Sequence, residues 1–114
     1  EEYLEHGGAG VLVLDADGIV RMANEAAARL LDVPLAKLRH RRPDPGVARV
    51  IHGEDRPPLF PQGNVSGAQR LFLGDDGARR FLNVSISLVA APGGASRLAV
   101  VTLHDVTPIV AAKE

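Results

Sequence analysis

The 114-residue chain contains no cysteine, which excludes disulfide bonds, thiolate metal sites and any catalysis or photochemistry based on cysteine. It has no apolar run near the roughly 18 residues that a membrane-spanning helix needs, and no signal peptide is visible. The formal net charge of −1 gives no global field that would attract nucleic acid or anionic lipid. We therefore expect one cytoplasmic domain without direct contact to membrane or nucleic acid.

The basic cluster Arg39-His40-Arg41-Arg42 is the one local exception to this balanced charge. It lies between apolar segments and has no aromatic neighbour on which an exposed base could stack. We predict that it is a solvated turn and not a binding patch. The chain also begins at Glu1 without a methionine, so we expect it to be a fragment of a longer protein, which can itself be anchored in a membrane.

The first half of the chain predicts two strands and three short helices. Residues 11–14 and 19–23 are strand-like, and Asp17-Gly18 between them favours a tight hairpin turn. Asn24 is a good cap for a helix that ends near residue 32, and a second short helix is expected over 34–38. Val47, Val50 and Ile51 form one stripe of a third helix over 46–52, and the many prolines favour a loop from there to residue 67.

The second half predicts three strands. The first begins near Ala68 and leads into a turn at residues 74–77. Residues 80–89 alternate between apolar and polar side chains, with period two, which indicates a half-buried strand, and residues 98–106 form the last one. Because the strands cluster instead of alternating with helices, we expect an α+β fold, in which short helices pack on one face of a five-stranded antiparallel sheet.

Four segments resemble PAS domains of bacterial sensor histidine kinases. Residues 10–31 (GVLVLDADGIVRMANEAAARLL) are similar to the opening of such domains, and Asp76-Gly77 followed by residues 84–87 (VSIS) is similar to their fourth strand. Asp105-Val106-Thr107 resembles the Asp-Ile-Thr triplet that closes them before a signalling helix, and residues 44–53 are similar to phosphate- and nitrogen-responsive sensor kinases. The resemblance implies a helical lead-in over 1–9, a PAS domain over 10–107 and an exit helix that starts within 108–114.

Two departures from the family pattern weaken any assignment to a subfamily. Val33 stands where the second helix usually has a serine or threonine cap, and Leu88 stands where many relatives have proline. Neither changes the expected fold.

The resemblance implies a sensory and dimerisation module of a two-component sensor histidine kinase, and not an enzyme in its own right. We expect a homodimer that uses Tyr3-Leu4 and exposed apolar residues of the sheet, and an output domain that follows in the same chain. Asp105 and Thr107 are expected to pin the junction to that domain by hydrogen bonds. Two alternatives stay open: a sensor that binds haem or a small ligand, and a ligand-free interaction module of a transcriptional regulator.

No catalytic or metal site is predicted. His104-Asp105-Val106-Thr107-Pro108 is one residue short of a kinase phosphoacceptor motif, and its histidine falls in a strand instead of a helix. The paired aspartates lie at hairpin turns, where aspartate is expected for its turn geometry. The four histidines, at positions 6, 40, 52 and 104, lack the spacing of metal ligands.

We also predict no cofactor. Haem is an alternative because the resemblance puts His52 at the helix end where haem-binding PAS domains have their axial histidine. A lone histidine beside a Gly-Glu-Asp turn is more typical of a surface cap, and no second haem feature accompanies it. Flavin is disfavoured because light-sensing relatives depend on cysteine, and their polar flavin contacts would fall near Leu82 and Leu103.

The interior between sheet and helices can be either a filled core, which dense packing favours, or a pocket for a small and largely apolar ligand. Three polar residues, Arg49, His52 and Gln69, are expected near the mouth of such a pocket. Its apolar lining would be Leu12, Leu14, Met22, Leu30, Leu82, Val84, Ile86, Val101 and Leu103.

Overall fold

The computed structural model describes residues 9–73, 77, 79–94 and 96–112. The strands are β1 (Gly10–Leu14), β2 (Val20–Ala23), β3 (Val65–Leu73), β4 (Arg79–Ala90) and β5 (Arg97–Asp105). The helices are α2 (Glu25–Leu31), α3 (Leu35–Leu38), α4 (Pro45–His52) and α5 (Thr107–Ala112). The predicted helical lead-in and the turn at 74–76 lie outside the described residues, apart from Ala9.

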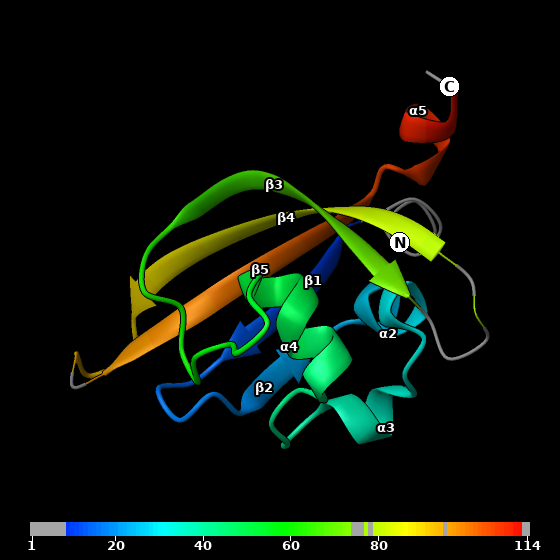
Figure 1. Cartoon of the computed structure of the whole chain (residues 1–114). Helices are drawn as coiled ribbons and strands as arrows, with labels where there is room; N and C mark the ends of the chain where they lie inside the picture. The colour runs from blue at the N-terminus through cyan, green and yellow to red at the C-terminus, as the bar shows by residue number, and fades with distance from the viewer. Residues whose placement is uncertain (1–8, 74–76, 78, 95, 113–114) are drawn as a thin grey trace.

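The strands form one antiparallel sheet in the order β2-β1-β5-β4-β3. Helices α2, α3 and α4 cover one face of this sheet, whereas α5 extends beyond the end of β5, away from the other helices (Figure 1). The predicted α+β arrangement is therefore confirmed. The sheet order also brings the first strand into contact with the last, so the edges are β2 and β3.

The hairpin between β1 and β2 is held by the Asp15 side chain. Its Oδ1 accepts hydrogen bonds from the backbone N–H groups of Asp17 (2.9 Å) and Ile19 (3.0 Å), and its Oδ2 pairs with Arg21 Nε. Gly18 has a φ of +81° in this turn, which glycine adopts without strain. The predicted Asp-Gly hairpin is confirmed.

Apolar side chains of the sheet and of the helices meet in one core. The inward positions of β4, Leu82, Val84 and Ile86, are at most 2% exposed, and Val47, Val50 and Ile51 of α4 are at most 3% exposed. This confirms the alternation predicted for residues 80–89 and the stripe predicted for the helix.

Met22 is a correction to the predicted interior. It lies opposite Val13, and residues that face each other across antiparallel strands share one face of the sheet. Since Leu12 and Leu14 point inward, Val13 and Met22 point outward, and Met22 is 64% exposed. The sequence pattern of β2 misled here because the strand is short and apolar on both faces.

Strand β3 begins three residues earlier than the predicted start at Ala68. A register shift between Val65 and Ala68 interrupts its pairing with β4, and Gly67 has a φ of +69° within it. The N–H of Gly67 donates to Ser85 Oγ at 3.0 Å. This bulge hides the period-two pattern from a sequence reading.

The basic cluster at 39–42 forms a turn, as predicted, and two of its arginines bind backbone carbonyls. Arg39 donates to the carbonyl of Ala23 and Arg42 to that of Asp17, at 3.2 and 3.3 Å. In the backbone, the Val20 N–H donates to the carbonyl of Arg41, and the His40 N–H donates to the carbonyl of Val20. The cluster thus fastens the segment after α3 to the β1–β2 hairpin.

Candidate ligand site between α4 and β3

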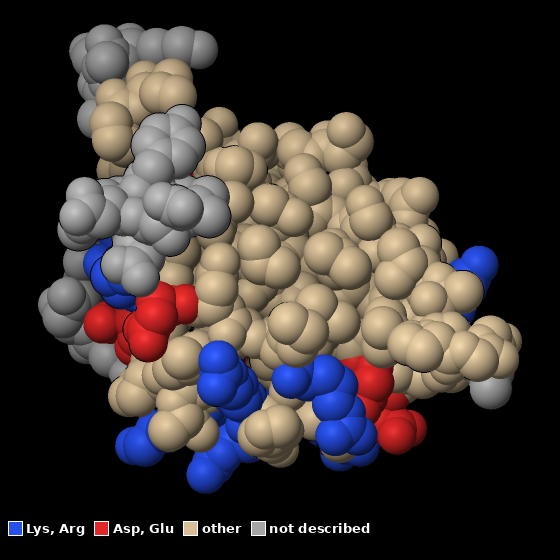
Figure 2. All heavy atoms as spheres, turned by 180° about the vertical axis from the view of Figure 1, so that it is seen from behind, with Lys and Arg blue, Asp and Glu red and all other residues tan. Residues whose placement is uncertain are grey.

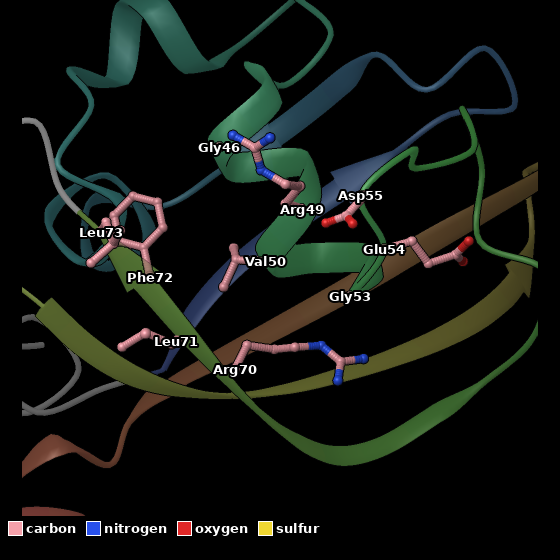
Figure 3. A pocket seen from close by; sticks show the side chains of 10 residues that line it. All are labelled: Gly46, Arg49, Val50, Gly53, Glu54, Asp55, Arg70, Leu71, Phe72 and Leu73. Carbon is pink, nitrogen blue, oxygen red and sulfur yellow. The ribbon is translucent and has the colours of Figure 1, made fainter.

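A pocket of about 320 Å³ lies between helix α4 and the edge strand β3 (Figure 3). The α4 residues that line it recur at the spacing of one helical face. The β3 residues are consecutive, because the pocket opens at the edge of the sheet and so meets both faces of the strand. The lining residues are Gly46, Arg49, Val50, Gly53, Glu54, Asp55, Arg70, Leu71, Phe72 and Leu73.

The floor of this pocket is apolar, and its helix side is open because of glycine. Val50 and Phe72 are 3% and 6% exposed and contribute their hydrophobic side chains to the floor. At Gly46, which is exposed, no described atom outside its chain neighbours and the helix backbone lies within 4 Å of the place where a side chain would begin. The start of α4 therefore leaves room for a side chain on this side.

Arg70 enters the pocket from the sheet. It lies opposite Leu82 of β4, and its side chain therefore starts on the inner face of the sheet. Its guanidinium carbon lies 2.5 Å from the place that a Cβ on Gly53 would occupy, so the glycine makes room for it. The Nε of Arg70 is buried and has no hydrogen-bond partner among the described residues.

Charges of both signs surround the pocket. Its lining includes four charged residues. Three of them are exposed, namely Arg49, Glu54 and Asp55, and the fourth is Arg70. In Figure 3, Arg49 points toward the start of α4, whereas the side chains of Arg70 and Glu54 extend toward the same end of the pocket. Arg70 is thus the one charged side chain of the pocket with a buried donor.

His52 lies on another side of α4, at a second pocket of about 260 Å³ that Pro57, Pro58 and Leu59 also line. Burial lowers the pKa of His52, and the nearby Glu54 carboxylate opposes this effect in part. The neutral imidazole is therefore favoured. The pocket is smaller than the roughly 300–1,000 Å³ typical of small-molecule sites, and gives the haem alternative no support.

The other predicted pocket residues are distributed over three regions. Gln69 is exposed and lies opposite Asn83, on the outer face, whereas Arg49 lines both pockets. Leu30 is partly buried against the core. The buried candidates are packed within the core cluster, and they are Leu12, Leu14, Leu82, Val84, Ile86, Val101 and Leu103.

Sequence reasoning missed Arg70, because the sequence contains only its two-residue spacing from Phe72 and not which face of the strand is buried. In an alternating strand, residues that lie two apart share a face, and Phe72 is the buried member of β3. Arg70 therefore had to start on the same face as Phe72. A charged residue at an inward position of a sheet is uncommon and is a candidate for a functional role.

The second predicted site is the exit joint, which we define as Phe81 together with Asp105, Val106 and Thr107. The N–H of Thr107 donates to Asp105 Oδ1 at 2.9 Å, and the N–H of Phe81 donates to Thr107 Oγ1 at 2.8 Å. The N–H of Val106 donates to the carbonyl of Phe81 at 2.8 Å. Two of these hydrogen bonds thus connect Phe81 of β4 to the start of α5, and the third connects the end of β5 to it.

The exit joint and the pocket share neighbouring residues. Leu71, which lines the pocket, lies directly opposite Phe81 in the pairing of β3 with β4. Arg80, the residue before Phe81, donates to the carbonyl of Leu30 at 3.0 Å and so connects the same part of β4 to α2. One strand-to-strand step therefore separates the pocket from the hydrogen bonds that hold α5.

The family model described as PAS fold matches residues 4–110 of the chain. The chain belongs to the PAS fold family. PAS domains of this kind are sensory modules and are typically not catalytic. No match was found among curated protein sequences.

Solved PAS domains from several kinds of protein are similar to this one. A PAS domain from a two-component sensor histidine kinase superposes with a TM-score of 0.63 at 11% identity, over 91% of this chain and 90% of the other. The PAS domain of nitrogen regulation protein NR(II) from Vibrio parahaemolyticus gives 0.60 at 19% identity, over 91% and 94%. That of the fruit-fly ELK potassium channel gives 0.64 at 11%, over 87% of each. At such identities the likeness shows the fold alone.

No helix formed by the described residues has the length and apolar character needed to cross a bilayer. Within the same part of the chain, His, Asp and Glu side chains form no group of three or more that could hold a metal ion.

Proposed function

We propose that this PAS domain senses an occupant of the pocket between α4 and β3 and passes the change through the exit joint to α5 and to an output domain that follows it. The parent that we propose is a cytoplasmic or membrane-anchored two-component sensor histidine kinase. The observation that carries the proposal is the position of Leu71, which lines the pocket and lies opposite Phe81 of the exit joint. A ligand that moves β3 therefore acts on the strand residue that holds the start of α5.

The physical basis is a choice between two arrangements of the joint. A ligand shifts such an equilibrium only by its difference in affinity for the two states. The joint rests on three hydrogen bonds, each of which contributes about 1 kcal/mol, so modest binding energy is enough to bias it. Because α5 extends away from the body of the domain, a small change at its first residue becomes a larger displacement at its end (Figure 1).

Replacing Asp105 by alanine in the full-length parent tests this coupling. The variant removes the acceptor for the Thr107 N–H, and Thr107→Val removes the acceptor for Phe81. We expect either change to alter basal autophosphorylation by up to roughly fivefold, which corresponds to the loss of one hydrogen bond, while the domain stays folded. Asp17→Ala, at an exposed position of the β1–β2 turn and away from the exit joint, is the matched control.

If both variants keep the wild-type level of autophosphorylation and circular dichroism shows that α5 is intact, the coupling is contradicted. A parent that lacks kinase activity but responds to the same variants through DNA binding would keep the coupling and replace the kinase by a transcriptional regulator.

We also propose that the domain forms a homodimer through the outer sheet face, the surface opposite the helices. This face carries no charged side chains over most of its area (Figure 2). An uncharged surface that carries several apolar side chains suits a two-fold dimer. Its apolar side chains are Val11, Val13, Met22, Leu71, Leu73, Phe81, Val89, Leu98 and Val100.

A further inference from the structure

We propose that the pocket between α4 and β3 binds a small monocarboxylate with an apolar substituent, and that its carboxylate accepts a hydrogen bond from Arg70 Nε. The location of the site rests on the proposed function, whereas the ligand class rests on the residues of the pocket. The buried and unpartnered Nε–H of Arg70 is the observation that carries this inference.

A buried guanidinium N–H needs an acceptor. More than about 90% of buried polar groups in folded proteins have a hydrogen-bond partner, and a guanidinium has donors but no acceptor. An acceptor that brings a lone pair close to Arg70 is therefore needed. A carboxylate fits best because it offers several lone pairs and compensates the positive charge in the same contact.

The remaining charges of the pocket limit the ligand to a single negative charge. Glu54 and Asp55 lie on the same lining as Arg70, and with Arg49 they bring the formal charge of the lining to zero. Like charges close to one another are unfavourable, so a second carboxylate on the ligand would be repelled by this acidic pair. A dicarboxylate or a phosphate is therefore a poorer match than a monocarboxylate.

The size and the floor of the pocket indicate a small apolar substituent. Val50 and Phe72 are buried at the floor, so a hydrocarbon group placed there exchanges contact with water for contact with protein. The volume of about 320 Å³ lies at the lower end of the range for small-molecule sites. The open space at Gly46 gives the substituent somewhere to extend.

A direct test observes Arg70 itself in the intact domain. The side-chain Nε–H resonances of ¹⁵N-labelled protein are assigned with Arg70→Lys, and the protein is titrated with acetate, propionate, 3-methylbutanoate and benzoate. We expect the Arg70 Nε–H resonance to shift and its exchange with water to slow, with affinity that rises with the apolar group. The neutral 3-methylbutanamide and the dianion succinate are expected to bind at least roughly tenfold more weakly than 3-methylbutanoate. The amide loses the charged hydrogen bond, and succinate gains repulsion from the acidic pair.

Variants separate the role of Arg70 from general effects of charge. Arg70→Gln and Arg70→Lys should each weaken 3-methylbutanoate roughly tenfold or more, since lysine has no donor at the Nε position. Arg97→Gln, an exposed arginine at the start of β5, is the matched control and should bind like the wild type. Gly46→Leu fills the open end without steric conflict and should reduce binding in a folded domain.

Two sources of a monocarboxylate can be distinguished with one pair of probes. Leucine and 4-methylpentanoate share the carboxylate and the branched chain and differ by the ammonium group, which Glu54 and Asp55 could accept. Tighter binding of leucine identifies the ligand class as amino acids, and equal or weaker binding identifies it as simple carboxylic acids.

If none of the carboxylates moves the Arg70 resonance at millimolar concentration, or if Arg70→Gln binds as well as the wild type, the inference is wrong. This result would leave the proposed coupling intact, because the Asp105→Ala and Thr107→Val experiment reads the exit joint without any ligand. Conversely, carboxylate binding without a change of output in those two variants would overturn the coupling and keep the ligand site.

Discussion

At the scale of single residues, His52 gives this domain a defined dependence on pH. Burial lowers the pKa of His52 below the ordinary value of 6.5, so the folded state binds fewer protons than the unfolded state between the two values. Above about pH 6.5 the histidine is neutral in both states, so its burial carries no penalty for a charge. As the pH falls through the folded pKa, the buried imidazole must take up a proton at a cost, and the free energy of unfolding decreases.

We therefore expect the free energy of unfolding to fall between pH 7.5 and pH 5, and to fall less in His52→Gln. Urea denaturation at the two pH values measures this difference. His104→Gln, at an exposed position of β5, is the matched control and should behave like the wild type. An equal loss of stability in wild type and His52→Gln would show that His52 does not carry the effect.

Asp15 illustrates the same physics for a carboxylate in a turn. Burial would raise the pKa of Asp15, but hydrogen bonds from Ile19, Arg21 and Asp17 outweigh it and lower the pKa. The charged form is therefore favoured by the fold. Its contribution is present above the ordinary value of 3.8 and is lost only as the pH falls below it.

At the scale of elements, Asn24 connects a strand to a helix. Its Oδ1 accepts from the N–H groups of Ala27 and Val11, both at 2.9 Å, and its Nδ2 donates to the carbonyl of Ala9 at 3.0 Å. The same side chain thus caps α2, as predicted, and fixes β1 beside it. Gly10 permits the close approach, because a Cβ there would lie 2.8 Å from Ala27 Cα.

Replacing Asn24 by alanine removes all three hydrogen bonds. We expect the free energy of unfolding in urea to drop by about 1–2 kcal/mol, the usual loss at a helix cap. Asn24→Asp keeps the acceptor for both N–H groups and loses only the bond to Ala9, so it should be less affected. Equal losses in the two variants would show that the Ala9 bond, and not the cap, matters most.

At the scale of the whole molecule, the outer sheet face is the surface on which the proposed dimer can be tested. A glutamate buried in an apolar interface is costly unless it is paired, so Met22→Glu and Val89→Glu should each weaken the dimer by roughly tenfold or more. Leu59→Glu is the matched control, because Leu59 is 57% exposed but follows the prolines beside α4, away from the outer sheet face. Analytical ultracentrifugation of the chain with residues 1–8 present measures this. A wild type that stays monomeric at high concentration contradicts the dimer.

The local sequence determined much of this fold. The Asp-Gly turn, the Asn24 cap, the stripe of α4 and the alternation of residues 80–89 each depend on residues a few positions apart, whose preferences act before any tertiary contact forms. These signals were enough to predict five antiparallel strands with helices on one face, and the resemblance to PAS domains.

Only the tertiary structure decided which faces and edges meet. The outward direction of Met22 follows from its pairing with Val13, and the inward direction of Arg70 follows from its pairing with Leu82. The two-step path from Leu71 to Phe81 by strand pairing, and from Phe81 to Thr107 by a hydrogen bond, joins segments far apart in the chain. Strand order and register depend on how the whole core packs, and no short stretch of sequence contains that information.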